Sequence, residues 1–231
     1  MSTPRPPAGQ PGDVTVELVQ ALHDEGVEHI VLVMRHSARE YAPGRHDLEN
    51  PLTDEGRELA KLMGQRLPKQ LTLRGYSSPA ERCVETADLI MSGHSEHGGT
   101  VTRNRVMEAM GVFYVLDQMK MYMAMRDAGG LVNLLNQWYA GKIARDIMMP
   151  PDLAAALIKD IAAEKLKERP PAPQLDLLVS HDFTLYTLKD RLLQQDSDRY
   201  PEIRFLDGVA FYIKDNQLHA RSHHEDARIL S

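Results

Sequence analysis

The chain has 231 residues, and its 42% hydrophobic content is ordinary for a globular protein that buries a substantial core. The lone Cys83 excludes an internal disulfide and a cysteine-based zinc site, and no apolar run approaches the ~20 residues that span a bilayer. The formal net charge of −6 argues against nucleic acid as a partner, because proteins that bind it usually display a basic surface. We therefore expect a cytoplasmic protein that binds neither nucleic acid nor membrane.

The first thirteen residues are rich in proline and glycine. They have neither the apolar core of a secretory signal nor the Arg-rich amphipathic character of a transit peptide. We expect residues 1–13 to be a disordered leader and residues 14–231 to form a single domain.

Apolar runs and capping residues predict strands that alternate with helices. Asp13 is expected to cap a helix that ends near Gly26, and the run from His29 to Arg35 is typical of a central parallel strand. Thr53 is the expected N-cap of the next helix, and Ser78 to Glu81 predicts a capping box at the start of another. Further strands are predicted at residues 71–76, 101–107, 175–180, 203–213 and 217–223.

From Gly111 to about Arg169 the pattern is helical, which predicts an insertion at about residues 111–170. Within it, Met119 and Met123 share a helical stripe, and this spacing favours core packing over a substrate lid. Trp138 is expected either to line a cavity beneath the insertion or to anchor it. The whole pattern predicts an α/β fold: a three-layer sandwich with a mostly parallel central sheet, helices on both faces and a small helical cap.

Reactive side chains follow three of the predicted strands. They lie in the segments Arg35–Arg39, Ser77–Arg82 and Ser180–Asp182. Open parallel sheets bind ligands outside the carboxyl ends of their strands, so these segments are the candidates for a functional site.

In this order, the segments resemble those of the histidine phosphatase superfamily, which includes the phosphoglycerate mutases and the histidine acid phosphatases. The matching stretches are Met34–Arg39, Leu52–Gly56, Ser77–Ala87 and Val179–Asp182. Each stretch alone is a weak signal, but their combined order is specific. The resemblance covers roughly residues 29–91 and 175–213, and it implies both the superfamily's fold and a phosphoryl-transfer activity.

The resemblance implies that His36 takes the phosphoryl group as a phosphohistidine, which water then hydrolyses. A neutral imidazole nitrogen is a good nucleophile near pH 7, and a covalent intermediate divides one difficult displacement into two easier ones. The matching phosphate-binding positions are Arg35, Arg39, Arg82 and, when protonated, His181. Arginine suits this role because its planar fork donates two hydrogen bonds to phosphate. No metal or cofactor is then required.

The leaving alkoxide needs a proton, and two carboxyls compete to supply it. Asp182 directly follows His181, as in the acid phosphatase branch, whereas Glu108 lies where the mutase branch places its glutamate. We expect Asp182 to be the acid, because a carboxyl beside a phosphate dianion holds its proton more tightly, and Glu108 to be structural. Asp182 would also suit the N-cap of the following helix.

The family usually has glycine after the nucleophilic histidine, whereas this chain has Ser37, which could crowd the phosphate or donate a hydrogen bond to it. Arg45 and His46 are further candidates to reach the pocket. A few arginines bind one phosphate while the exterior stays acidic, so the net charge allows a small-molecule phosphate ester as substrate. We therefore predict a phosphomonoesterase. The alternatives are a phosphomutase, a protein-phosphohistidine phosphatase and a phosphate-binding regulatory module.

Overall fold

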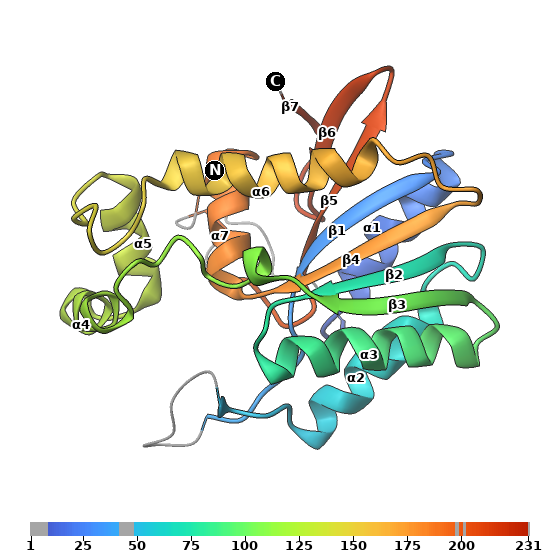
Figure 1. The fold of residues 1–231 in the computed structure, drawn as a ribbon, viewed down its shortest axis with the longest axis horizontal. Helices are drawn as coiled ribbons and strands as arrows, with labels where there is room; N and C mark the ends of the chain where they lie inside the picture. Colours follow the sequence, from blue (N-terminus) through green and yellow to red (C-terminus); the bar gives the residue numbers. More distant parts are fainter. Residues whose placement is uncertain (1–8, 42–48, 197–198, 201, 231) are drawn as a thin grey trace.

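The computed structural model describes residues 9–41, 49–196, 199–200 and 202–230. Within these ranges one sheet has the strand order β3-β2-β4-β1-β5-β6-β7 (Figure 1). The pairs among β3, β2, β4 and β1 are parallel, whereas β5, β6 and β7 pair antiparallel. The α/β class and the mostly parallel centre are confirmed. The strands are β1 (His29–Arg35), β2 (Thr72–Ser77), β3 (Thr100–Val106), β4 (Gln174–Ser180), β5 (Gly208–Lys214), β6 (Gln217–Arg221) and β7 (Arg228–Leu230).

Helices cover both faces of this sheet, and the side chains of β1 alternate between the two cores. Ile30 and Leu32 pack with three helices on one face, whereas Val31 and Val33 pack with two helices on the other. The strand is thus buried on both sides, as its continuous apolar run predicts. The first face carries α1 (Asp13–Asp24), α2 (Asp54–Arg66) and α3 (Glu81–Glu96), and the second carries α6 (Pro151–Leu166) and α7 (Asp182–Arg191).

Two further helices, α4 (Gln118–Ala128) and α5 (Leu131–Tyr139), extend beyond one end of the sheet (Figure 1). The short 3-10 helix η2 (Glu108–Met110) precedes them in the chain. The buried Trp138 anchors this segment: its ring centroid lies 5.5 Å from that of Tyr114 and 5.7 Å from that of Phe183 in α7. Anchoring is therefore the role that the contacts of Trp138 support.

The core packing expected of Met119 and Met123 is wrong, because both side chains are exposed on α4. The packed stripe of this helix consists of Met121, Ala124 and Met125, which lie against the core on the α7 side. Both stripes have helical spacing, so the pattern alone could not distinguish them.

The capping box predicted at Ser78 is also wrong. Helix α3 begins at Glu81, and its N-cap residue, Ala80, contributes no side-chain hydrogen bond. At α2, by contrast, the side chain of Thr53 accepts a hydrogen bond from the backbone N–H of Gly56, as predicted. The strand predicted at residues 203–213 begins only at Gly208, and β7 was not predicted.

Residues 1–8 of the predicted leader, together with Arg45 and His46, lie outside the described residues. Across the described ranges, every helix is too short or too polar to traverse a bilayer.

Helices α2 and α3 approach each other closely at glycines. A Cβ atom added at Gly93 would lie 2.0 Å from the carbonyl oxygen of Lys61, and one added at Gly64 would lie 1.9 Å from that of Ile90. Both separations are far below a van der Waals contact, so neither position accepts a side chain unless the backbones move apart.

We expect Gly93→Ala to lower the free energy of unfolding by about 1–3 kcal/mol, the usual cost of overpacking. For a chain of this size, each kcal/mol lowers the Tm by about 2–4 °C, which differential scanning calorimetry can measure. Ser95→Ala is the control, because Ser95 is exposed on the same helix, and it should leave the Tm unchanged. A Gly93→Ala variant as stable as the parent would show that the two helices are not in contact there.

Candidate active site

Three of the predicted segments meet at the carboxyl ends of β2, β4 and β1, which are neighbours in the sheet. Backbone hydrogen bonds continue past the strand ends. The N–H of His36 donates to the carbonyl of Ser180 (3.0 Å), and the N–H of Ser78 donates to the carbonyl of Val179 (2.9 Å). The sheet therefore fixes the backbone positions from which these side chains project.

His36 is buried directly after β1, with only 2% of its surface exposed. Its Nδ1 lies 2.7 Å from the carbonyl oxygen of Ser37, and its Nε2 accepts a hydrogen bond from Nε of Arg82 (3.1 Å). An arginine has only donors, so Nε2 carries the lone pair and Nδ1 carries the proton. Burial, and then the nearby charges of His181, Arg82 and Arg35, hold the pKa of His36 well below its ordinary value of 6.5.

Arg82 links the two histidines. It is buried as the second residue of α3, and its Nη2 lies 3.4 Å from Nδ1 of His181. Nε2 of His181 lies 2.9 Å from the hydroxyl of Ser78. The rings of His36 and His181 pack edge to face with centroids 5.6 Å apart. A single guanidinium thus faces a lone pair on each imidazole, and the site is rigidly held.

Arg35 lies on the other side of His36 and has several partners. It donates to the carbonyl of Ile203 (2.5 Å) and forms an ion pair with Asp182 (2.9 Å). Among the described residues its buried Nε has no hydrogen-bond partner. The ring centroid of Phe205 lies 4.1 Å from the guanidinium carbon, within the range of a cation–π contact.

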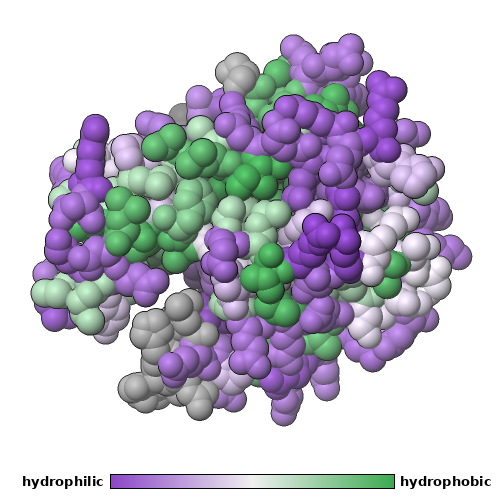
Figure 2. All heavy atoms as spheres, viewed as in Figure 1, coloured by the Kyte–Doolittle hydropathy of each residue, from purple (hydrophilic) through white to green (hydrophobic). Residues whose placement is uncertain are grey.

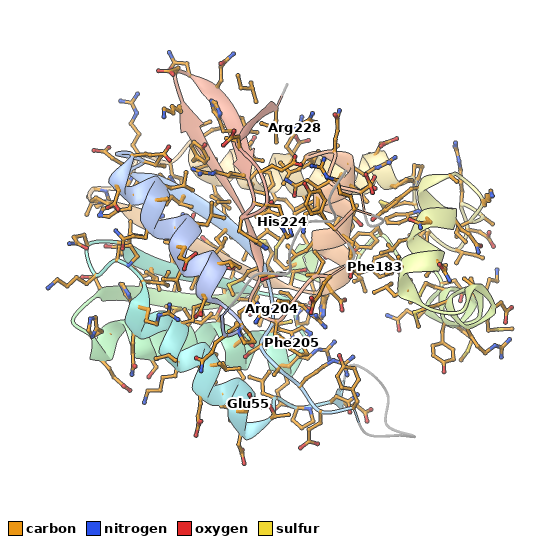
Figure 3. The ribbon with its side chains drawn as sticks, turned by 180° about the vertical axis from the view of Figure 1, so that it is seen from behind. Glu55, Phe183, Arg204, Phe205, His224 and Arg228 are labelled. Atoms are coloured by element: carbon orange, nitrogen blue, oxygen red, sulfur yellow. The ribbon has the colours of Figure 1, made fainter. Side chains whose placement is uncertain are left out.

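The sequence prediction did not include Phe205 in the site, and it included Ser78 only as part of the segment Ser77–Arg82, without a role in the chemistry. Phe205 lies in the segment that leads into β5, next to Arg204, and its ring centroid is 5.9 Å from that of His36 (Figure 3). A single aromatic residue in a loop gives no sign in the sequence that its ring contacts Arg35 and His36. Ser78 gave a signal that we interpreted as a helix cap, although its hydroxyl contacts His181.

The remaining predicted residues lie in different places. Asp182 is the first residue of α7, next to Arg35, and also accepts a hydrogen bond from the backbone N–H of Phe183 (2.8 Å). Glu108 is exposed at the start of η2. Arg39 pairs with Leu52 in an isolated bridge, and its guanidinium lies 4.1 Å from the ring centroid of Tyr41.

Ser37 is turned away from the imidazole of His36. Its hydroxyl donates to the carbonyl of Gly56 (2.6 Å), and its backbone N–H donates to the hydroxyl of Thr86 (3.1 Å). The side chain that replaces the family's usual glycine therefore joins β1 to α2. Its oxygen is engaged in a hydrogen bond with the helix and does not take up the space of a phosphate.

A cavity of about 1270 Å³ opens beside these residues. His181 and Ser78 line its inner end, and Glu108 lines it as well. Its other walls come from α6 and from the segment of residues 107–118. A ligand held between His36 and His181 would therefore extend past Glu108 into this cavity.

We expect His36 to be neutral at pH 6.5, where an ordinary histidine is half protonated, because burial and neighbouring cations both lower its pKa. Histidine-selective NMR would show a neutral ring with the proton on Nδ1. Arg82→Met should raise the pKa of His36, because it removes one of the charges that lower it. A wild-type ring that titrates near 6.5 would contradict the buried geometry.

Comparison with known proteins agrees with this arrangement. The family model described as "Histidine phosphatase superfamily (branch 1)" matches residues 31–215. A search among curated proteins found no match.

Several solved structures share the fold. The mycobacterial glucosyl-3-phosphoglycerate phosphatase in complex with VO3 has a TM-score of 0.55 at 18% identity, over 85% of this chain and 99% of that one. A phosphoserine phosphatase mutant from Entamoeba histolytica, in complex with phosphoserine, has a TM-score of 0.53 at 16% identity, over 84% and 95%. The phosphoglycerate mutase from Bacillus anthracis has a TM-score of 0.52 at 20% identity, over 86% and 94%.

These identities are low, so the likenesses show the fold alone, whereas the family model covers most of the chain. The chain belongs to the histidine phosphatase superfamily.

Proposed function

We propose that this protein hydrolyses a small-molecule phosphomonoester through a phosphohistidine intermediate on Nε2 of His36. The observation that carries the proposal is the buried imidazole whose Nε2 lone pair faces a guanidinium. A phosphoryl group bound by Arg82 would lie directly against the nucleophilic nitrogen. The proposal includes the division of the chain expected from the sequence, with residues 14–231 as one catalytic domain and the helices of residues 111–170 as its cap.

The reaction proceeds in two displacements. In the first, Nε2 of His36 attacks phosphorus, the bond from phosphorus to the ester oxygen breaks, and the alcohol leaves after gaining a proton. In the second, water attacks phosphorus and gives a proton to the carboxylate that acted as acid, the bond from phosphorus to Nε2 breaks, inorganic phosphate leaves, and His36 returns to its neutral form. The carbonyl of Ser37 accepts a hydrogen bond from Nδ1–H of His36 and stabilises the positive charge that the ring gains in the first step.

Fixed cations stabilise the charge on the phosphoryl oxygens. Arg35 and Arg82 supply these positive charges beside His36, and His181 and Arg39 are the further phosphate ligands that the sequence resemblance implies. Arginines do not lose their charge, so this binding persists across the working pH range.

The contacts of the two carboxyls support different roles for them. Asp182 forms an ion pair with Arg35 and accepts a backbone N–H, so its contacts are those of a residue that positions Arg35. Glu108 lies exposed in the cavity that His181 also lines, where a leaving group would depart. We therefore assign the general acid to Glu108 and the positioning of Arg35 to Asp182, which differs from the preference drawn from the sequence.

We expect His36→Ala to abolish the release of phosphate from every phosphomonoester, with chelator present throughout. Labelled substrate should leave acid-labile phosphate on the wild-type protein and none on the variant. His97→Ala changes an exposed histidine at the end of α3 and should keep full activity as the control. Turnover that survives in His36→Ala would exclude this residue as the nucleophile.

We expect Glu108→Gln to lower kcat for alkyl phosphates by about 100- to 10,000-fold, the usual contribution of a general acid. The same variant should lose less than about tenfold on p-nitrophenyl phosphate, because its leaving group departs without a proton. Asp182→Asn should lower kcat/KM for both esters by a similar factor and weaken inhibition by vanadate, since it releases Arg35. If Asp182→Asn instead shows the loss that depends on the leaving group, Asp182 is the acid.

A further inference from the structure

The cavity beside His181 is larger than a phosphate group requires. Its volume of about 1270 Å³ exceeds the roughly 300–1,000 Å³ of common small-ligand pockets. Among the described residues, His181 lines this cavity, whereas His36, Arg35 and Arg82 do not, so the phosphoryl group would occupy only the end next to His181. The rest of the space is available to the alcohol part of the substrate, so the residues that line the cavity indicate which kind of alcohol would bind.

One wall is a face of α6. Leu157 and Ile161 line the cavity four residues apart, and Lys165 follows on the same stripe. Residues at this spacing project from one side of a helix, so the stripe is continuous. From Leu157 to Lys165 it extends about 12 Å along the helix axis. This wall suits an elongated group that lies along α6.

The facing wall is also mainly apolar. It includes Met107, Val112, Phe113 and Val115, all partly exposed to the cavity. On the surface, apolar side chains gather on this face of the protein, below α6, with hydrophilic side chains around them (Figure 2). An apolar chain between α6 and this wall would contact Leu157 and Ile161 on one side and Val112 and Phe113 on the other.

The charges along the cavity are mainly negative. Among the described lining residues there are five carboxylates and one lysine, and the lysine ammonium lies 3.3 Å from the ring centroid of Tyr76. Glu164 and Glu168 form ion pairs with Lys167 and Arg74, which partly offset their charge. The others, Glu81, Glu108 and Asp160, are exposed in the lining. A substrate with a second anionic group would be repelled here.

From this cavity we infer that the substrate is the phosphate monoester of an elongated, largely apolar alcohol that carries a positive charge, such as an amine, away from the phosphate. The inference rests on the proposed hydrolysis at His36. The phosphate binds at the cationic end, the chain lies between α6 and residues 107–118, and the cation meets the carboxylates. Asp160 is placed for this role, because it lies one residue before Ile161 on the cavity side of α6.

The test is a panel of phosphomonoesters assayed for phosphate release. In the series ethyl, butyl and hexyl phosphate, kcat/KM should rise roughly two- to fourfold with each methylene that the walls cover. At a fixed chain length of six carbons, kcat/KM should fall in the order aminohexyl, hexyl and carboxypentyl phosphate. The first and last should differ by about tenfold at low salt, because exposed charges interact weakly, and the difference should shrink at high salt.

Variants connect these preferences to the cavity. Phe113→Ala should flatten the chain-length series, and Asp160→Asn should reduce the ratio of aminohexyl to carboxypentyl phosphate by about threefold. Asp152→Asn is the matched control, because it makes the same change on α6 at an exposed residue outside the lining, and it should leave that ratio unchanged.

The outcomes separate the two proposals. Hydrolysis of p-nitrophenyl phosphate that depends on His36, together with equal rates across the alkyl panel, would overturn this inference and leave the proposed function standing. No hydrolysis of any ester would overturn both. A lysine-rich phosphoserine peptide turned over faster than aminohexyl phosphate would show that the cavity admits a protein segment, and would overturn the small-molecule substrate.

Discussion

The backbone hydrogen bond from His36 to Ser180 joins the ends of β1 and β4, and the geometry of the whole site depends on it. Because β4 lies between β1 and β2, the next bond, from Ser78 to Val179, adds the segment that leads into α3. Residues distant in sequence thus meet at the carboxyl ends of strands that lie in the middle of the sheet and are covered by helices on both faces. The precision that an in-line displacement requires comes from these strand ends and not from the loops around them.

The same contacts explain the state of the nucleophile. Two buried guanidiniums are costly unless their N–H groups find acceptors. Arg35 has the carbonyl of Ile203 and the carboxylate of Asp182, whereas Arg82 faces Nε2 of His36 and Nδ1 of His181. A protonated imidazole nitrogen cannot accept a hydrogen bond. In the proposed mechanism Arg82 therefore has two effects: it binds the phosphate, and it keeps Nε2 of His36 free of a proton.

The sequence was sufficient to predict those features that depend only on residues close together in the chain. The apolar run of β1 and the cap at Thr53 depend on neighbouring residues, and both were predicted. It failed where a partner comes from a distant segment: Ser78 resembles a helix cap until His181 is brought beside it. The positioning role proposed for Asp182 and the contact of Phe205 with Arg35 likewise depend on distant segments, which spacing along the sequence does not reveal. The motifs indicated the candidate residues, whereas the different role proposed for each of them needed tertiary contacts.

Similarity at 16–20% identity extends to the fold but not to the choice of substrate, so specificity has to be argued from the cavity of this chain. In the proposed complex with substrate, the two ends of the cavity carry opposite charges. Arg35 and Arg82 attract the phosphate inward, while Asp160 attracts a cation outward. A ligand with both charges would then have one favourable orientation along α6, the one that presents phosphorus to His36. Selection of the alcohol and orientation for attack would thus arise from the same distribution of charge.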